Sequence, residues 1–148
     1  MIWGWTISAA VLAPNLIWMM LPPPDVPIRN DPPSKVRVLV GLVEQAGRVA
    51  VITVPVFYDF QMTRLVDRMA LAVMMAALGI YYAGWGRYFR RGRRYRLLFL
   101  PLGWLPVPLA ISPVIAVLSA AVQFHSWLLA AVVATFGVVH ISSSLRET

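Results

Sequence analysis

The sequence predicts an all-α integral membrane protein, a bundle of five transmembrane helices with its N-terminus outside and its C-terminus in the cytoplasm. Composition is the first observation: of 148 residues, 59% are hydrophobic and 13% are charged, and the mean hydropathy is +0.72. Polar side chains are too scarce to cover a water-soluble globule of this size, which disfavours a soluble enzyme domain. The second observation is a series of long apolar stretches, and the third is an uneven distribution of basic residues.

The apolar stretches divide residues 1–148 into five spans of one domain. About 20 helical residues cross the hydrocarbon core, and the predicted spans are about 2–21, 36–58, 65–88, 97–121 and 126–145. The first has no basic start and no small-residue cleavage site, so we expect a retained helix rather than a signal peptide. Residues 22–35 carry six prolines, which favour an extended connector. Short links predict that spans two and three, and spans four and five, are antiparallel neighbours.

Basic residues lie mainly on one of the two sides that these spans define. Residues 22–37 hold three, residues 87–96 hold six and the tail holds Arg146, whereas the other side has only Arg64 and Arg68. Because cytoplasmic loops carry the excess of Lys and Arg, this ten-to-two asymmetry sets the predicted orientation. The net charge of +7 then reflects orientation and contact with anionic headgroups, so we expect membrane lipid, and no nucleic acid, as a partner.

Three polar side chains fall within the second span, at a depth where lipid is expected: Glu44, Gln45 and Arg48. Glu44 and Arg48 are four residues apart and therefore share one face of a helix. One interpretation is an intrahelical salt bridge that fixes packing, and the other is a functional site, because a charged group in the membrane is costly. Gly41 and Gly47 would let another helix or a ligand approach this backbone closely.

Other polar and aromatic residues are expected at a similar depth. With a helical rise of about 1.5 Å per residue, such groups in all five spans lie about 7–12 Å from the cytoplasmic ends. A pocket needs such a layer, although aromatic belts at the membrane interface also concentrate Trp and Tyr there. We predict a cavity that opens to the cytoplasmic half or to the inner leaflet and is lined by Asn15, Glu44, Arg48, Tyr81, Trp85 and Trp104.

The fourth span is interrupted by four prolines: Pro101, Pro106, Pro108 and Pro113. They kink this span or break it into half-helices, and irregular backbone at membrane depth needs cover from protein or a cavity. His125 in the last link is expected to be solvated. His140, near the inner end of the fifth span, is either a packed interfacial residue or a hydrogen-bond donor in the pocket.

Several chemistries have no support in the sequence. No GxxxxGK[ST], GxGxxG, HExxH or GxSxG motif occurs, so nucleotide hydrolysis, dinucleotide redox chemistry, zinc proteolysis and lipase-type catalysis are unsupported. The chain has no cysteine, and Asp59 and Asp67 fall at the outer ends of their spans, away from Glu44. We therefore expect no metal site and no cofactor.

Four stretches together resemble a family of small bacterial membrane proteins of mostly unassigned function: LAPNLIWMMLPPPDVP, LVEQAGRVAVITVPVFY, YYAGWGRYFRRGRRYRLLF and PLGWLPVPLAISPV. The likeness covers most of the chain and extends to the membrane-bound terpene cyclases of indole-sesquiterpenoid (drimane-type) pathways. It implies a multi-pass protein of the bacterial inner membrane that acts in terpenoid secondary metabolism, as an isomerase or lyase, on a farnesyl chain attached to an indole or similar head. Only Glu44, in LVEQAGR, is carried over as the acid. The DDxxD and DxDD motifs of soluble cyclases are absent.

The chemistry of such a reaction fits the composition, because a prenyl chain partitions into lipid and its cyclisation needs an acid and aromatic faces that attract cations. We expect Glu44 to start the cyclisation by protonating an alkene or an epoxide, with a carboxyl oriented by Gln45 or Asn15 and with cations stabilised by Tyr81, Trp85 and Trp104. The expected substrate-binding residues are Asn15, Gln45, Arg48, Tyr81, Trp85, Trp104 and His140. Two alternatives stay open: a small-molecule transporter or binding module that uses Glu44, and a structural or regulatory membrane subunit.

Overall fold

The computed structural model describes residues 4–27 and 34–147, and these residues form an all-helical protein without strands. Residues 2 and 3 of the first predicted span, and residues 28–33 of the proline-rich connector with Arg29, lie outside this description. Two short 3-10 helices, η1 (Val54–Phe57) and η2 (Tyr95–Leu98), accompany the α-helices. The α-helices are α1 (Gly4–Met20), α2 (Lys35–Thr53), α3 (Leu65–Arg90), α4 (Pro108–Gln123) and α5 (Trp127–Leu145).

Three segments of this structure are long and apolar enough to cross a membrane: Lys35–Phe57, Leu65–Arg90 and Trp127–Leu145. The apolar helices α1 and α4 are shorter, with 17 and 16 residues. Many large apolar side chains face outward, among them Val36, Leu39 and Leu42 on α2, which are 62–71% exposed. An outer surface of this kind fits a lipid environment and indicates a membrane protein.

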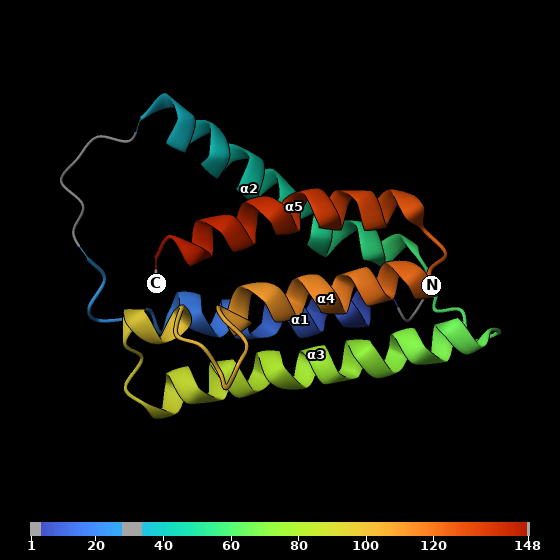
Figure 1. Cartoon of the computed structure of the whole chain (residues 1–148), viewed down its shortest axis with the longest axis horizontal. Coiled ribbons are helices and arrows are strands. Elements are labelled where there is room, and N and C mark those ends of the chain that lie inside the picture. The colour runs from blue at the N-terminus through green and yellow to red at the C-terminus, as the bar shows by residue number, and fades with distance from the viewer. Residues whose placement is uncertain (1–3, 28–33, 148) are drawn as a thin grey trace.

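Helices α1, α3, α4 and α5 run back and forth along one long axis, with α4 packed between α3 and α5, and α2 crosses this axis obliquely (Figure 1). Small side chains allow α3 and α4 to approach closely, since a Cβ on Gly84 would lie 2.7 Å from the Leu109 side chain. The largest apolar cluster is buried mainly between α3, α4 and α5, where it includes Met74, Val117 and Leu129. Helices α1 and α2 also contribute to it, through Ile7 and Val51.

Helix α2 packs against α5 rather than against α3 (Figure 1). The prediction that the second and third spans are antiparallel neighbours is therefore wrong. The link between them crosses the end of the bundle instead of turning tightly. Tyr58 stacks on Phe124 with ring centroids 5.5 Å apart, and Phe60 lies 5.0 Å from the same ring. These aromatic contacts lead the chain past α4, which separates α2 from α3.

The predicted span at 97–121 is wrong at its start, because α4 begins only at Pro108. The preceding residue, Val107, has a φ of 36°, a left-handed conformation that a helix cannot contain. Residues 99–107 instead form an irregular loop with a bridge between Leu102 and Leu105. Proline explains the difference: it lacks an N–H donor, and it disfavours helical geometry in the residue before it.

Arg87 anchors this loop to α3. Its guanidinium donates hydrogen bonds to the carbonyl oxygens of Pro101 and Leu100, both at 2.6 Å, and of Leu97 at 3.3 Å. The same end of the bundle also gathers the connector and the C-terminal segment, since the Tyr95 amide donates to Asp25 and the Tyr95 hydroxyl donates to Glu147. One member of the arginine-rich run therefore has a structural role in addition to its charge.

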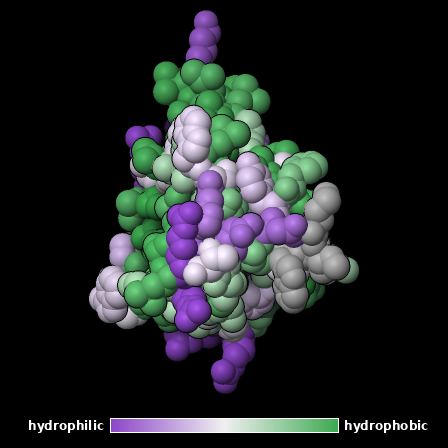
Figure 2. All heavy atoms as spheres, turned by 90° about the vertical axis from the view of Figure 1, so that its right-hand side faces the viewer, coloured by the Kyte–Doolittle hydropathy of each residue, from purple (hydrophilic) through white to green (hydrophobic). Residues whose placement is uncertain are grey.

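Asp67 organises the opposite end, which faces the viewer in Figure 2 with hydrophilic side chains near its centre and hydrophobic ones around them. The buried Asp67 carboxylate accepts from the Arg64 amide at 2.8 Å and lies 2.9 Å from His125 Nε2. His125 is exposed, which agrees with the prediction that it is solvated, and it is also paired with Asp67. This pair ties the start of α3 to the turn between α4 and α5.

Candidate functional site

Glu44, Arg48 and His140 meet in the seam between α2 and α5. Glu44 Oε1 accepts a hydrogen bond from Arg48 Nη2 at 2.7 Å and lies 2.8 Å from His140 Nδ1. The Glu44–Arg48 contact is the i, i+4 salt bridge that the spacing predicts, whereas His140 lies 96 positions after Glu44 in the chain. The structure therefore joins two sequence-predicted residues of α2 to a third on α5.

The packing around the seam holds these three side chains in place. A Cβ on Gly47 would lie 2.6 Å from the Phe136 ring, so α2 can approach α5 this closely only because Gly47 has no side chain. Phe136 in turn stacks on the His140 imidazole, with centroids 5.0 Å apart and planes 12° from parallel. The glycine and the aromatic ring thus fix the position of the imidazole that contacts Glu44.

The two oxygens of the Glu44 carboxylate have different surroundings. Within the described part of the chain, both polar contacts end on Oε1, and no hydrogen bond is made to Oε2. The Glu44 and His140 side chains are each 16% exposed, whereas Arg48 is 46% exposed. A carboxyl anchored through one oxygen, with its second oxygen uncommitted, is suited to proton transfer or to binding a cation.

Asn15 and Tyr81 do not hydrogen-bond to Glu44; they form a separate cluster on the Val11 carbonyl of α1, beside a carbonyl that Tyr82 satisfies. Asn15 Nδ2 donates to Tyr81 Oη and to the Val11 carbonyl, both at 2.8 Å, and Tyr81 Oη donates to the same carbonyl at 2.9 Å. Pro14 lies inside α1 and has no N–H for the Ala10 carbonyl, four residues earlier. Tyr82 Oη donates to that carbonyl at 2.8 Å.

We expect Tyr82→Phe to lower the free energy of unfolding in detergent by about 0.5–1.5 kcal/mol, because the Ala10 carbonyl loses its donor. The matched experiment is a double-mutant cycle with Pro14→Ala, which restores the missing helical N–H. In the Pro14→Ala background, Tyr82→Phe should lower the free energy of unfolding by much less. An equal decrease in both backgrounds would contradict the role of Tyr82 as the donor that replaces the missing N–H.

The remaining predicted residues lie elsewhere. Trp85 is buried in an aromatic cluster on α3, edge-on to Tyr81 at 6.2 Å and stacked on Phe89 at 5.6 Å. Gln45 is exposed, and Trp104 is 89% exposed in the loop before α4. The predicted cavity lining of Asn15, Glu44, Arg48, Tyr81, Trp85 and Trp104 is wrong, because the prolines keep the exposed Trp104 out of a helix and because Asn15 and Tyr81 are engaged with α1.

A cavity does exist, but at the other end of the bundle and with different walls. It lies between α1 and α3, and none of the predicted site residues lines it. Sequence reasoning missed one of its two polar members, Gln123; the available signal was an amide at the end of an otherwise apolar stretch. Within residues 4–27 and 34–147, no group of three or more His, Cys, Asp or Glu side chains could hold a metal ion.

Comparisons of the chain with protein-family models, with curated proteins and with solved structures give no match.

Proposed function

We propose that the protein is a membrane-embedded enzyme that closes a prenyl chain, with Glu44 as the proton donor. One observation carries this proposal: Glu44 is held through one oxygen by Arg48 and His140, and its other oxygen accepts no hydrogen bond from the described residues. The carboxyl lies in a seam between two helices that are each long and apolar enough to cross a membrane. In this proposal His140 and Arg48 replace Gln45 and Asn15 as the groups that orient the acid.

The proposed reaction needs no group beyond the chain, its substrate and a proton from water. Glu44 is ion-paired with Arg48 in the structure, so it takes up this proton before it acts as the acid. Its O–H bond then breaks, a C–H bond forms at a terminal alkene, and π electrons of the next alkene close the ring. The Glu44 carboxylate takes a proton from a carbon beside the final cation, which restores an acid whose proton exchanges with water and gives a cyclic isomer of unchanged mass. With an epoxide, the proton goes to oxygen and the product carries a hydroxyl group.

The substrate would reach Glu44 from the bilayer. Only 11% of the apolar window of the α2 span is buried within the protein, so lipid-soluble molecules have access to this helix along much of its length. A farnesyl chain is apolar and would be concentrated in that environment. A positioned acid at membrane depth is therefore exposed to the class of molecule on which it is proposed to act.

The direct test is expression of the protein with a farnesylated indole and with its terminal epoxide, followed by mass spectrometry of the extract. We expect a cyclic isomer of at least one substrate that is absent from cells without the protein. In D₂O the alkene product should gain one deuterium on carbon, whereas the epoxide product should gain none on carbon. Absence of any cyclic isomer from both substrates would overturn the proposal.

A transporter that uses Glu44 is the second candidate, and the sparse packing of α2 favours it. This helix contacts mainly α5, so exchange of the Glu44 partners could move it without disrupting the core of α3, α4 and α5. Uptake of a cationic dye into proteoliposomes under a pH gradient would support transport. Genes for a prenyltransferase and an epoxidase beside this one would instead favour cyclisation.

We also propose that all five helices span a bacterial cytoplasmic membrane, with the N-terminus outside. Helices α1 and α4 are short but apolar: with 17 residues α1 is at the lower end of the range for a span, and α4, with 16, is one residue below it. The hydrogen bonds of Tyr95 to Asp25 and Glu147 bring the connector and the C-terminal segment to the arginine-rich end. By the excess of basic residues, that end would be cytoplasmic.

Reporter fusions test this orientation. A cytoplasmic reporter should be active when it is fused to the C-terminus and inactive when it is fused to the N-terminus, and a periplasmic reporter should show the reverse. Activity of the cytoplasmic reporter at the N-terminus alone would invert the topology. Activity at both termini would mean an even number of spans.

A further inference from the structure

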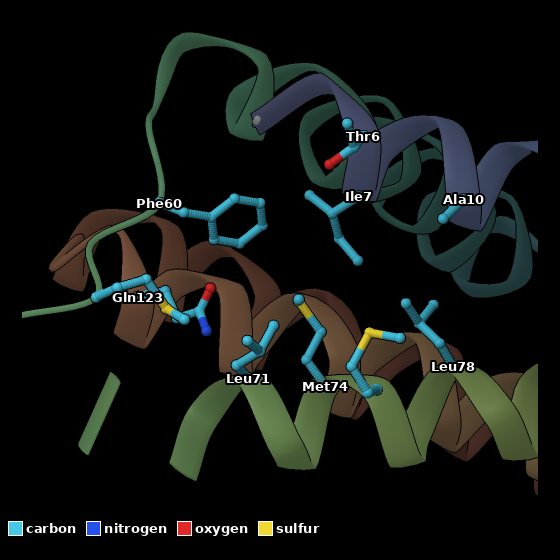
Figure 3. Close-up of a pocket in the computed structure, with 10 residues that line it drawn as sticks. Thr6, Ile7, Ala10, Phe60, Leu71, Met74, Leu78 and Gln123 are labelled. Atoms are coloured by element: carbon cyan, nitrogen blue, oxygen red, sulfur yellow. The ribbon is translucent and has the colours of Figure 1, made fainter. Parts of the chain in front are cut away.

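The cavity between α1 and α3 has a volume of about 520 Å³, within the range of about 300–1,000 Å³ that is typical of small-molecule sites. Apart from Thr6 and Gln123, every lining residue is apolar. Figure 3 shows Phe60 and Ile7 on one side of the space and Leu71, Met74 and Leu78 on the other. The walls therefore suit an apolar molecule rather than a polar metabolite.

Gln123 places one unsatisfied polar atom in this apolar wall. Its side chain is fully buried, and its amide nitrogen donates to the Asp67 carbonyl oxygen at 2.9 Å. Because a carbonyl can only accept, this contact fixes which end of the amide faces Asp67. The amide oxygen then points to the Phe60 side of the cavity and has no hydrogen-bond partner among the described residues (Figure 3). It is itself buried, so an occupant reaches it when the neighbouring side chains of the wall shift.

A buried acceptor without a donor is costly, by an amount comparable to the loss of a hydrogen bond. A purely apolar occupant would leave that cost in place, whereas an occupant with a hydroxyl or N–H group would remove it. Water is a poor substitute, because it needs two to four polar partners and this wall offers few. The acceptor therefore selects for a donor attached to an apolar body.

We propose that this cavity binds an apolar molecule that carries a single hydrogen-bond donor, such as a long-chain alcohol, with its hydroxyl on the Gln123 amide oxygen. Methionine side chains at Met62, Met74 and Met75 make the wall adaptable in shape, because the unbranched thioether has several rotatable bonds. The site is separate from Glu44 and does not depend on the proposed reaction.

The rim of the cavity indicates how such a molecule would enter. Met62 and Met75 are 45% and 59% exposed, so the opening lies on the lateral, apolar surface. From Leu71 to Leu78 the α3 wall extends over about 10 Å of helix. A ligand dissolved in the bilayer could therefore enter sideways between α1 and α3.

The experiment measures binding of tritiated 1-dodecanol to the protein in lipid nanodiscs, with empty discs as the background. Competition by unlabelled 1-dodecanol and by dodecyl methyl ether compares two molecules of the same apolar type, of which the ether lacks the donor. We expect saturable binding and a preference for the alcohol of about 3- to 10-fold, the size expected from one net hydrogen bond. Equal competition by the two compounds, or no saturable binding, would overturn the proposal.

Three variants locate the site. Gln123→Leu should reduce affinity for the alcohol to that for the ether and leave the ether unchanged. Leu78→Trp should fill the cavity and abolish binding of both, while Ile80→Trp, on the same helix outside the cavity, should bind both normally. Retention of the preference in Gln123→Leu, or normal binding by Leu78→Trp, would contradict the assignment.

Discussion

Glu44→Gln is expected to lower the rate of cyclic product formation by about 10²–10⁴, the usual contribution of a positioned general acid. Glutamine keeps the shape of the side chain and can still accept from Arg48, so the variant should fold. It has no acidic proton to donate, so the first step of the proposed cyclisation is lost. The measurement is product per unit of purified protein, by mass spectrometry.

The neighbouring amide provides the matched control. Gln45→Leu changes an exposed polar side chain at the same depth of the same helix, and it should retain nearly full activity. Full turnover by Glu44→Gln would refute the acid assignment. Equal loss in both variants would show that the polarity of α2, rather than the Glu44 carboxyl, determines the rate.

Gly47→Leu is expected to separate α2 from α5 and to inactivate the protein. The new side chain would have to occupy the space of the Phe136 ring, 2.6 Å from the Cβ position. Overpacking of this kind costs about 1–3 kcal/mol, and relief by movement of α2 would break the contact between Glu44 and His140. Thermal unfolding in detergent and product formation should therefore both be impaired.

The control for this change lies six residues earlier on the same helix. A Cβ at Gly41 meets nothing within 4 Å, so Gly41→Leu should be neutral for stability and activity. If Gly41→Leu and Gly47→Leu have the same effect, the close approach of α2 to α5 is not what the site requires. If Gly47→Leu is fully active, the contact between Glu44 and His140 is not needed for the function.

The existence of the helices could be predicted from the sequence, because long apolar runs and prolines act locally. The helices at 65–88 and 126–145 were placed within about two residues, the usual uncertainty of helix ends. The start of α4 and the partner of α2 could not be predicted in the same way. The first depends on which of several prolines ends the irregular loop, and the second depends on where the aromatic side chains of the link pack.

The candidate site was predictable in part for a similar reason. The pairing of Glu44 with Arg48 follows from helical spacing, which is local. The contact with His140 depends on α2 lying against α5, which no local pattern encodes. Asn15 and Tyr81 are predicted as pocket residues from their depth, but depth does not reveal that both bind the Val11 carbonyl, or that Tyr82 satisfies the Ala10 carbonyl that Pro14 leaves without a donor.

The meeting of α2 and α5 beside Glu44 and His140 is tested most directly by a disulfide between Gly47→Cys and Phe136→Cys. A Cβ at position 47 lies 3.0 Å from the Phe136 Cβ, close to the distance of about 3.5–4.5 Å in disulfides. The chain has no other cysteine, and both Glu44 and His140 are retained. In oxidised native membranes we predict that this pair loses both free thiols and that Gly41→Cys with Phe136→Cys does not. Free thiols in the first pair, or equal disulfide formation in the two pairs, would contradict the close approach of α2 to α5 beside Glu44 and His140.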